Sequence, residues 1–119
     1  MEIGRTILFV YGTLKRGEQN FRLIADQEFL GAATTAPRYR VFDLGPHPGL
    51  VRDEVNGLVV HGELFAVTEC CLAELDEFEE VPGPFMRERI EVAGYEDVWA
   101  YYLNKPVPEG AKSGDRWPL

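Results

Sequence analysis

The hydrophobic positions of the chain alternate over several short stretches, and over one longer stretch they recur with the period of a helix. Residues 6–14, TILFVYGTL, are rich in β-branched and aromatic side chains, which predicts a buried strand. A proline- and glycine-rich loop is expected over residues 45–51, GPHPGLV. Asn56-Gly57 predicts a hairpin turn that leads into the next strand. The remaining strands are expected at residues 29–36, 38–44, 58–67, 85–94 and 98–106, the last two joined near Gly94.

The stretch TECCLAELDEFEEV, residues 68–81, carries the clearest helical pattern. Thr68 can cap its start, and Cys71, Leu75 and Phe78 form one apolar stripe at positions i, i+4 and i+7. The Pro-Gly-Pro sequence at 82–84 ends this helix.

A second, short helix is expected within residues 20–31, where Phe21, Ile24 and Ala25 share one face. The tail that follows Pro106 reads as a loop, although Trp117 can pack back onto the body. About six or seven sequential strands with one or two flanking helices indicate an α+β fold built on a small antiparallel, barrel-like sheet. The length of 119 residues fits a single domain, 1–119.

Composition and charge narrow the function. The formal net charge of −8 argues against binding to nucleic acid, whose backbone requires clustered cations. No apolar run approaches the ~20 residues of a membrane span, and the N-terminus reads as a strand rather than a signal peptide, so we expect a cytoplasmic protein. The adjacent Cys70 and Cys71 lack metal-ligand spacing, and His47 and His61 are too few for a histidine cluster. We therefore expect no metal and no cofactor.

The polar segment after the first strand has the glycine spacing of a phosphate-binding loop, because four residues separate Gly12 from Gly17. Glu18 and Gln19 follow where such a loop needs a lysine and a hydroxyl, which excludes nucleotide binding. One alternative is that Gly12 lets a ligand approach the backbone, so that the next two amides face an anion. The other is a tight turn whose two basic residues, Lys15 and Arg16, are simply solvated.

Five acidic residues crowd the end of the predicted helix, and most of them are expected to form a solvated face. Glu79 differs in position, since it follows Leu75 by four residues and Leu72 by seven and so borders the apolar stripe. A partly buried carboxylate there would have a raised pKa and could act as an acid or a base.

These segments together resemble one family. The motifs YGTLKRG near the N-terminus, GELFAV before the helix and LDEFEEVPGPFMR at its end are similar to those of the gamma-glutamylcyclotransferase superfamily. Within it, the likeness is greatest to the gamma-glutamylamine cyclotransferase branch and related bacterial proteins. The resemblance runs from about Phe9 to Tyr102, with a weaker match at SGDRW.

The resemblance implies a small barrel with flanking helices and an enzyme that cyclises a gamma-glutamyl group to release 5-oxoproline. It assigns the glutamyl-binding loop to Tyr11, Gly12, Thr13 and Leu14, and the catalytic carboxylate to Glu79. This chain departs from the family pattern at two places. Phe85 stands where the amine-cyclising branch often has a tyrosine, and Glu80 stands where a glycine or serine commonly follows the glutamate. Both departures bear on the choice of leaving group.

The chemistry suits a chain without an evident Ser-His-Asp or Cys-His arrangement, because the substrate supplies its own α-amino nucleophile. The expected partner is thus a small gamma-glutamyl amide, with Glu79 as general acid and base. Two alternatives stay open: a non-catalytic small-molecule-binding module of the same fold, and a thiol enzyme that uses Cys70 or Cys71. The sequence leaves open which amine departs and which oligomeric state the protein adopts.

Overall fold

The computed structural model describes residues 4–119. Along the chain the elements are β1 (Thr6–Val10), the 3-10 helix η1 (Phe21–Leu23), β2 (Glu28–Thr34), β3 (Tyr39–Asp43), β4 (Pro48–Arg52), β5 (His61–Val67), α1 (Glu69–Phe78), β6 (Phe85–Val92), β7 (Tyr95–Leu103) and β8 (Ser113–Gly114).

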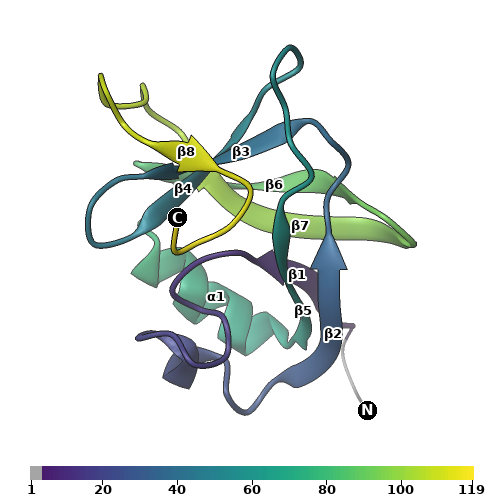
Figure 1. The fold of residues 1–119 in the computed structure, drawn as a ribbon. Coiled ribbons are helices and arrows are strands. Elements are labelled where there is room, and N and C mark those ends of the chain that lie inside the picture. The colour runs from purple at the N-terminus through teal and green to yellow at the C-terminus, as the bar shows by residue number, and fades with distance from the viewer. Residues whose placement is uncertain (1–3) are drawn as a thin grey trace.

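The strands form one curled sheet in the order β2-β5-β1-β7-β4-β3-β8, with β6 paired to β7 (Figure 1). Most neighbouring strands are antiparallel, as β1 is to β5 and β6 to β7. The expected α+β fold with a barrel-like sheet is confirmed. Two pairings, β1 with β7 and β4 with β7, are parallel. They join strands far apart in sequence, which local patterns do not report.

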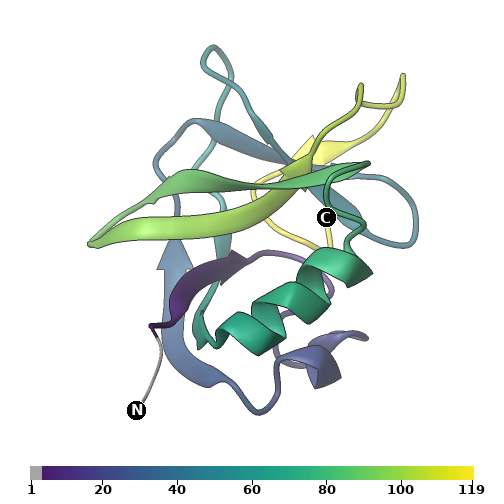
Figure 2. The same cartoon turned by 180° about the vertical axis from the view of Figure 1, so that it is seen from behind.

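Strand β1 is buried on both faces, and this divides the core in two. Leu8 and Val10 pack with Leu72 and Leu75 of α1, which lies across this face of the sheet (Figure 2). Phe9 on the opposite face of β1 belongs to a second cluster with residues of β3 to β7. The end of β1 is thus fixed between two packed layers, and the loop that follows it starts from a rigid base.

The predicted helix is confirmed, and Thr68 caps it by accepting a hydrogen bond from the Cys71 amide at 3.2 Å. Its buried residues are Cys71, Leu72 and Leu75, whereas Phe78 is 42% exposed, so the expected stripe was wrong at its last position. The helix ends at Phe78, before the Pro-Gly-Pro sequence. Within residues 4–119, no helix combines the length and apolarity needed to cross a membrane.

The second predicted helix is wrong in extent. Only Phe21–Leu23 form a single 3-10 turn, and Ile24 is buried while Ala25 is exposed. The Asn20 amide is already bonded to the Thr13 carbonyl at 2.9 Å. This bond commits the segment to the preceding loop, and β2 begins at Glu28, which leaves no room for a longer helix.

The loop expected over residues 45–51 is also partly wrong, because Pro48–Arg52 form strand β4. Pro48 opens the strand, a position that tolerates the missing amide of proline. Its partner in β3 is Asp43, and Leu50 pairs with Tyr102 of β7.

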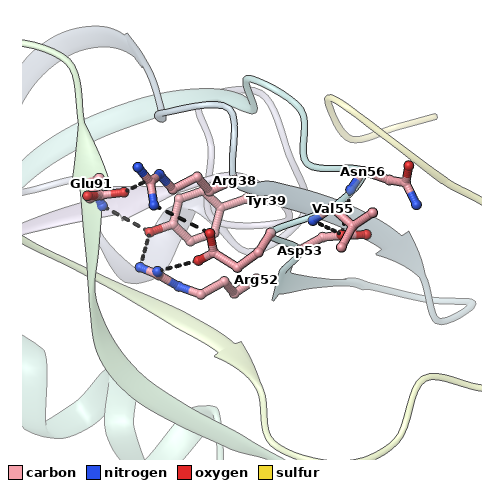
Figure 3. A network of polar contacts seen from close by, with 8 residues as sticks. Arg38, Tyr39, Arg52, Asp53, Val55, Asn56 and Glu91 are labelled. Carbon is pink, nitrogen blue, oxygen red and sulfur yellow. Dashed lines mark hydrogen bonds and ion pairs between the residues drawn. The ribbon is translucent and has the colours of Figure 1, made fainter.

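The hairpin expected at Asn56-Gly57 is absent from the described chain, although the chain does turn there. The Asp53 carboxylate accepts hydrogen bonds from the amides of Val55 (3.0 Å) and Asn56 (2.8 Å), which orders the turn (Figure 3). Strand β5 then pairs with β1 and β2 instead of folding back on β4. Local turn chemistry was read correctly, but the partners of the strands were not.

The same view shows a polar cluster that joins β3, β4 and β6. The Tyr39 hydroxyl accepts hydrogen bonds from Arg52 Nη2 and from the Glu91 amide, both at 3.1 Å (Figure 3). Arg38 pairs with Glu91 at 3.2 Å, and Arg52 pairs with Glu54 at 2.8 Å. Each arginine has a carboxylate partner, so the role of this cluster is to hold β3, β4 and β6 together.

The hairpin near Gly94 is confirmed by the antiparallel register of β6 and β7. Trp117 is partly buried against the second core cluster, so the tail does pack back onto the body. Its carbonyl accepts a hydrogen bond from the Lys15 ammonium. The C-terminal segment is thereby attached to the loop that follows β1.

Asp76 fastens the second half of α1 to the sheet. Its carboxylate accepts two hydrogen bonds from Arg87 of β6, at 3.0 and 2.9 Å, and one from the Tyr101 hydroxyl of β7 at 2.6 Å. Arg87, and to a lesser degree Tyr101, hold the pKa of Asp76 below its usual range. The helix end therefore has a fixed position over β6 and β7.

Replacing Asp76 by asparagine removes the charge but keeps an oxygen that accepts from Tyr101. We expect D76N to lose about 1–2 kcal/mol of unfolding free energy at pH 7, measured by urea denaturation. A carboxyl with a lowered folded-state pKa stabilises above its unfolded value and loses this contribution as the pH falls through the folded value. The deficit of D76N should therefore shrink below about pH 4. The neighbouring E77Q, at an exposed position, serves as control; equal stability of D76N and wild type at pH 7 would contradict this role.

Candidate active site

All five residues expected from the sequence line one cavity. Tyr11, Gly12, Thr13 and Leu14 approach it from the end of β1, and Glu79 approaches it from the C-terminal end of α1. The remaining lining residues come from β1, the start of β4 and the strands β6 and β7, and are Phe9, Val10, His47, Pro48, Phe85 and Tyr101. We call this the inner cavity.

The loop after β1 is ordered by its own backbone. The Lys15 amide donates to the Gly12 carbonyl at 3.1 Å, and Asn20 donates to Thr13 twice, at 2.9 Å from its amide and 2.9 Å from its side chain. Within residues 4–119, the amides of Thr13 and Leu14 donate to no protein acceptor. Leu14 is buried, Thr13 is half-buried and both line the inner cavity, so their unpaired amides are available there to an anionic or carbonyl oxygen.

Gly12 is required for a reason other than the expected one. A Cβ atom built there would lie 2.4 Å from Cγ of Pro48, a rigid ring at the start of β4. The glycine thus lets the loop pack against β4, where any larger residue would push the two apart. Closeness of the backbone to a ligand is not needed to explain this glycine.

Both basic residues of the loop form hydrogen bonds within the protein, so the alternative in which Lys15 and Arg16 are simply solvated is wrong. Lys15 is bonded to the Trp117 carbonyl, as described above. Arg16 donates to the Glu63 carboxylate from its amide (2.9 Å) and from its Nε (3.3 Å), and its guanidinium lies 3.8 Å over the Phe29 ring. Both side chains fix the outer part of the loop to its surroundings.

The Tyr11 hydroxyl is fully used within the protein. It donates to the Tyr101 carbonyl at 2.5 Å and accepts from the Leu50 amide at 3.1 Å. Burial, and secondarily the negative charge of Glu79, raises the pKa of Tyr11 above its usual range. The phenol is therefore a neutral structural group, and a role for Tyr11 in binding falls to its backbone and ring.

Glu79 is the C-cap of α1 and is half-buried. Its amide donates to the Leu75 carbonyl at 2.8 Å, which fixes the backbone at the last turn. Burial raises the pKa of its carboxyl to about 7. Glu80, one residue on, is exposed and has a positive φ of 58°. The two adjacent carboxylates thus have different surroundings, and Glu79 is the one on the inner cavity.

Two further cavity residues were missed by the sequence reasoning. Tyr101 forms part of the wall, and its hydroxyl is bonded to Asp76. The ring of His47 meets the ring of Phe85 at a centroid distance of 5.7 Å. No local signal marks these residues, since β4, β6 and β7 reach the site only through the order of strands in the sheet.

The geometry gives no support to a thiol enzyme. Cys70 is exposed, Cys71 is buried, and neither lines the inner cavity. Burial, with smaller contributions from nearby carboxylates, raises the pKa of Cys71 to about 11, which keeps the thiol protonated. Within the part of the chain that the structure describes, no three His, Cys, Asp or Glu side chains are grouped to hold a metal ion.

Comparisons with known proteins show the family of the chain. Residues 8–118 match the family described as gamma-glutamyl cyclotransferase, AIG2-like. The chain is 34% identical over 111 residues to the gamma-glutamylcyclotransferase family protein YtfP of Escherichia coli strain K12, covering 91% of this chain and 93% of that protein. It is 37% identical over 109 residues to the gamma-glutamylaminecyclotransferase of Homo sapiens, covering 86% and 71%.

The fold also matches that of a solved member of this family. The crystal structure of an AIG2-like protein from Mus musculus superposes with a TM-score of 0.87 at 27% identity, over 97% of this chain and 89% of that one. The chain belongs to the gamma-glutamyl cyclotransferase, AIG2-like family.

The burial of Glu79 has a cost that can be measured. A carboxyl whose folded pKa is raised binds a proton more tightly in the native state, so stability falls as the pH rises from its unfolded value to its folded value. We expect E79Q to be more stable than wild type at pH 8, by about 2–3 kcal/mol, and equal to it near pH 4. Denaturant unfolding at the two pH values measures this. E80Q, at an exposed position, should stay within about 0.5 kcal/mol at both; a parallel gain there would show that burial of Glu79 is not the cause.

Proposed function

We propose that the protein is a gamma-glutamyl cyclotransferase that converts a gamma-glutamyl amide into 5-oxoproline and a free amine. One observation carries the proposal: Glu79, with a pKa raised to about 7, shares a small cavity with the unpaired amides of Thr13 and Leu14. A proton acceptor and oxygen-binding donors therefore line the same cavity.

The proposed reaction needs no protein nucleophile. The α-amino nitrogen of the substrate attacks its own γ-carbonyl carbon, a carbon–nitrogen bond forms, and the bond to the leaving nitrogen breaks. The α-nitrogen loses two protons as it goes from ammonium to lactam N–H, and the leaving nitrogen gains two as it goes from amide N–H to ammonium. The Glu79 carboxylate accepts each proton from the first nitrogen and delivers it to the second, so that it is regenerated. Ring closure within one molecule can reach effective molarities of ~10⁵ M or more when the reacting groups are well oriented.

The raised pKa of Glu79 decides whether this proton transfer is feasible. An α-ammonium titrates near ~8 and an ordinary glutamate near ~4.3, which makes transfer uphill by about 5 kcal/mol. With Glu79 at about 7, the difference falls to about 1.4 kcal/mol. Burial thus brings the pKa of Glu79 close to that of the α-ammonium, as a general base at neutral pH requires.

The loop after β1 supplies hydrogen-bond donors for the negatively charged groups of the substrate. In this proposal the Thr13 and Leu14 amides either hold the substrate α-carboxylate or stabilise the oxyanion that forms on the γ-carbonyl oxygen. Tyr11 and Gly12 contribute indirectly: the phenol of Tyr11 is bonded to β7 and to Leu50, and Gly12 allows contact with Pro48. Both keep the amides in place.

Direct assay tests the proposal. The protein is incubated with a panel of gamma-glutamyl amides, and 5-oxoproline and the released amine are quantified by mass spectrometry. Formation of both in equal amounts supports a cyclotransferase. Binding of 5-oxoproline without turnover of any substrate would instead identify a non-catalytic binding module of the same fold.

A matched pair of variants tests the role of Glu79. E79Q keeps the size of the side chain but cannot accept the proton, so kcat should fall by about 10²–10⁴-fold. Its binding of 5-oxoproline, measured by calorimetry, should persist because the loop amides are unchanged. E77Q makes the identical chemical change at an exposed helix position that lines neither cavity, and should retain kcat within about twofold. Normal turnover by E79Q, or loss of turnover in E77Q, would show that the base is wrongly assigned.

A further inference from the structure

A second cavity adjoins the inner one. It shares four lining residues with it, Thr13, His47, Glu79 and Phe85, and has the larger volume, about 440 Å³ against about 30 Å³. We call it the outer cavity. Seven residues line it alone, from the loop after β1, the end of α1, and the segments that flank β4, β6 and β7: Gln19, Asn20, Pro46, Phe78, Glu80, Pro84 and Lys105.

Glu79 borders both cavities, which places the reacting bond at their junction. If the glutamyl part contacts the loop amides at the mouth of the inner cavity, the nitrogen that leaves and everything attached to it extend into the outer one. This step rests on the proposed function. It turns the lining of the outer cavity into the surface that meets the leaving group.

Lys105 is the one lysine or arginine among the described residues that line either cavity. Within residues 4–119 its ammonium makes no ion pair and no side-chain hydrogen bond, and Glu80 on the same cavity is not within pairing distance of it. By contrast, the other lysine near the site, Lys15, is bonded to the Trp117 carbonyl. Lys105 is thus a free cation in a protein of formal net charge −8.

The backbone beside Lys105 is anchored at the cavity edge. The Asn104 amide donates to the Pro84 carbonyl at 2.9 Å, and the Asn104 side chain donates to the Gly83 carbonyl at 3.1 Å. These bonds fasten the end of β7 to the segment that leads into Phe85. The backbone position that carries the Lys105 side chain is therefore fixed at the edge of the outer cavity.

We propose that the outer cavity binds the leaving group and that Lys105 selects leaving groups that carry a carboxylate. The preferred substrates are then gamma-glutamyl conjugates of amino acids or peptides, rather than those of simple alkylamines. An ammonium that has no partner in the free protein gives up no ion pair when it binds a carboxylate.

Matched substrates isolate the carboxylate. Gamma-glutamyl-alanine and gamma-glutamyl-ethylamide differ only in this group, as do gamma-glutamyl-ε-lysine and gamma-glutamyl-cadaverine. We expect wild type to prefer the carboxylate member of at least one pair by about three- to tenfold in kcat/KM. The preference should decrease as salt is raised from 0.01 to 0.5 M, because the contact is open to solvent.

Variants at two lysines complete the test. K105M should bring the preference ratio close to one, and K105R should preserve most of it. K112M changes a lysine that lines neither cavity, so its ratio should equal that of wild type. Equal rates for both members of both pairs in wild type, or a preference that survives in K105M, would overturn the assignment of Lys105 while leaving the proposed function intact. Failure of all four conjugates to yield 5-oxoproline would overturn both.

Discussion

Tyr101 connects the two halves of the site. Its carbonyl receives the Tyr11 hydroxyl from the loop, at 2.5 Å, and its own hydroxyl donates to Asp76 of α1 at 2.6 Å. Asp76 lies one helical turn before Glu79, and Arg87 holds its other oxygen. The loop that carries the unpaired amides and the helix end that carries Glu79 are therefore both hydrogen-bonded to Tyr101 of β7. Without these bonds, the distance between the helix end and the loop would not be fixed.

The same packing determines the chemistry of Glu79. A carboxyl at the C-terminal end of a helix is unfavourable when ionised, because the helix dipole is negative there, and burial adds to this penalty. A protein selected for stability alone would place a neutral or basic residue at this position. The retained carboxyl, with its pKa near neutral, is what an acid–base catalyst requires. The stability lost at Glu79 is offset in part by the ion pair at Asp76.

Local signals in the sequence were enough for the helix, its Thr68 cap and the strands that flank Gly94. The position of Glu79 beside the apolar stripe was also readable, since it follows from helical periodicity alone. The resemblance to the family then joined Glu79 to the Tyr11–Leu14 loop. Where the sequence reasoning failed, the cause lies in contacts between distant residues. The turn residues at Asp53 do not predict that β5 pairs with β1. The sequence around Pro48 carries no local pattern that predicts a strand there.

In the site, too, features set by the local sequence were predictable, and features set by contacts between distant residues were not. Asp76 reads as one member of an acidic run, and only the register of β6 and β7 brings Arg87 and Tyr101 to it. Lys15 and Arg16 read as a solvated pair, yet their partners come from the C-terminal segment and from β5. Residues whose role depends on their own helix or turn were predictable. Those whose role depends on strand order were not.

The most direct test is an NMR titration of the Glu79 carboxyl carbon in the wild-type protein, assigned with E79Q, in the absence and presence of 5-oxoproline. We predict a midpoint near 7 for the free protein and a change in both midpoint and chemical shift when 5-oxoproline binds. A midpoint near the ordinary glutamate value of ~4.3, unaffected by the ligand, would contradict this prediction, because Glu79 would then be a solvated acid outside the site.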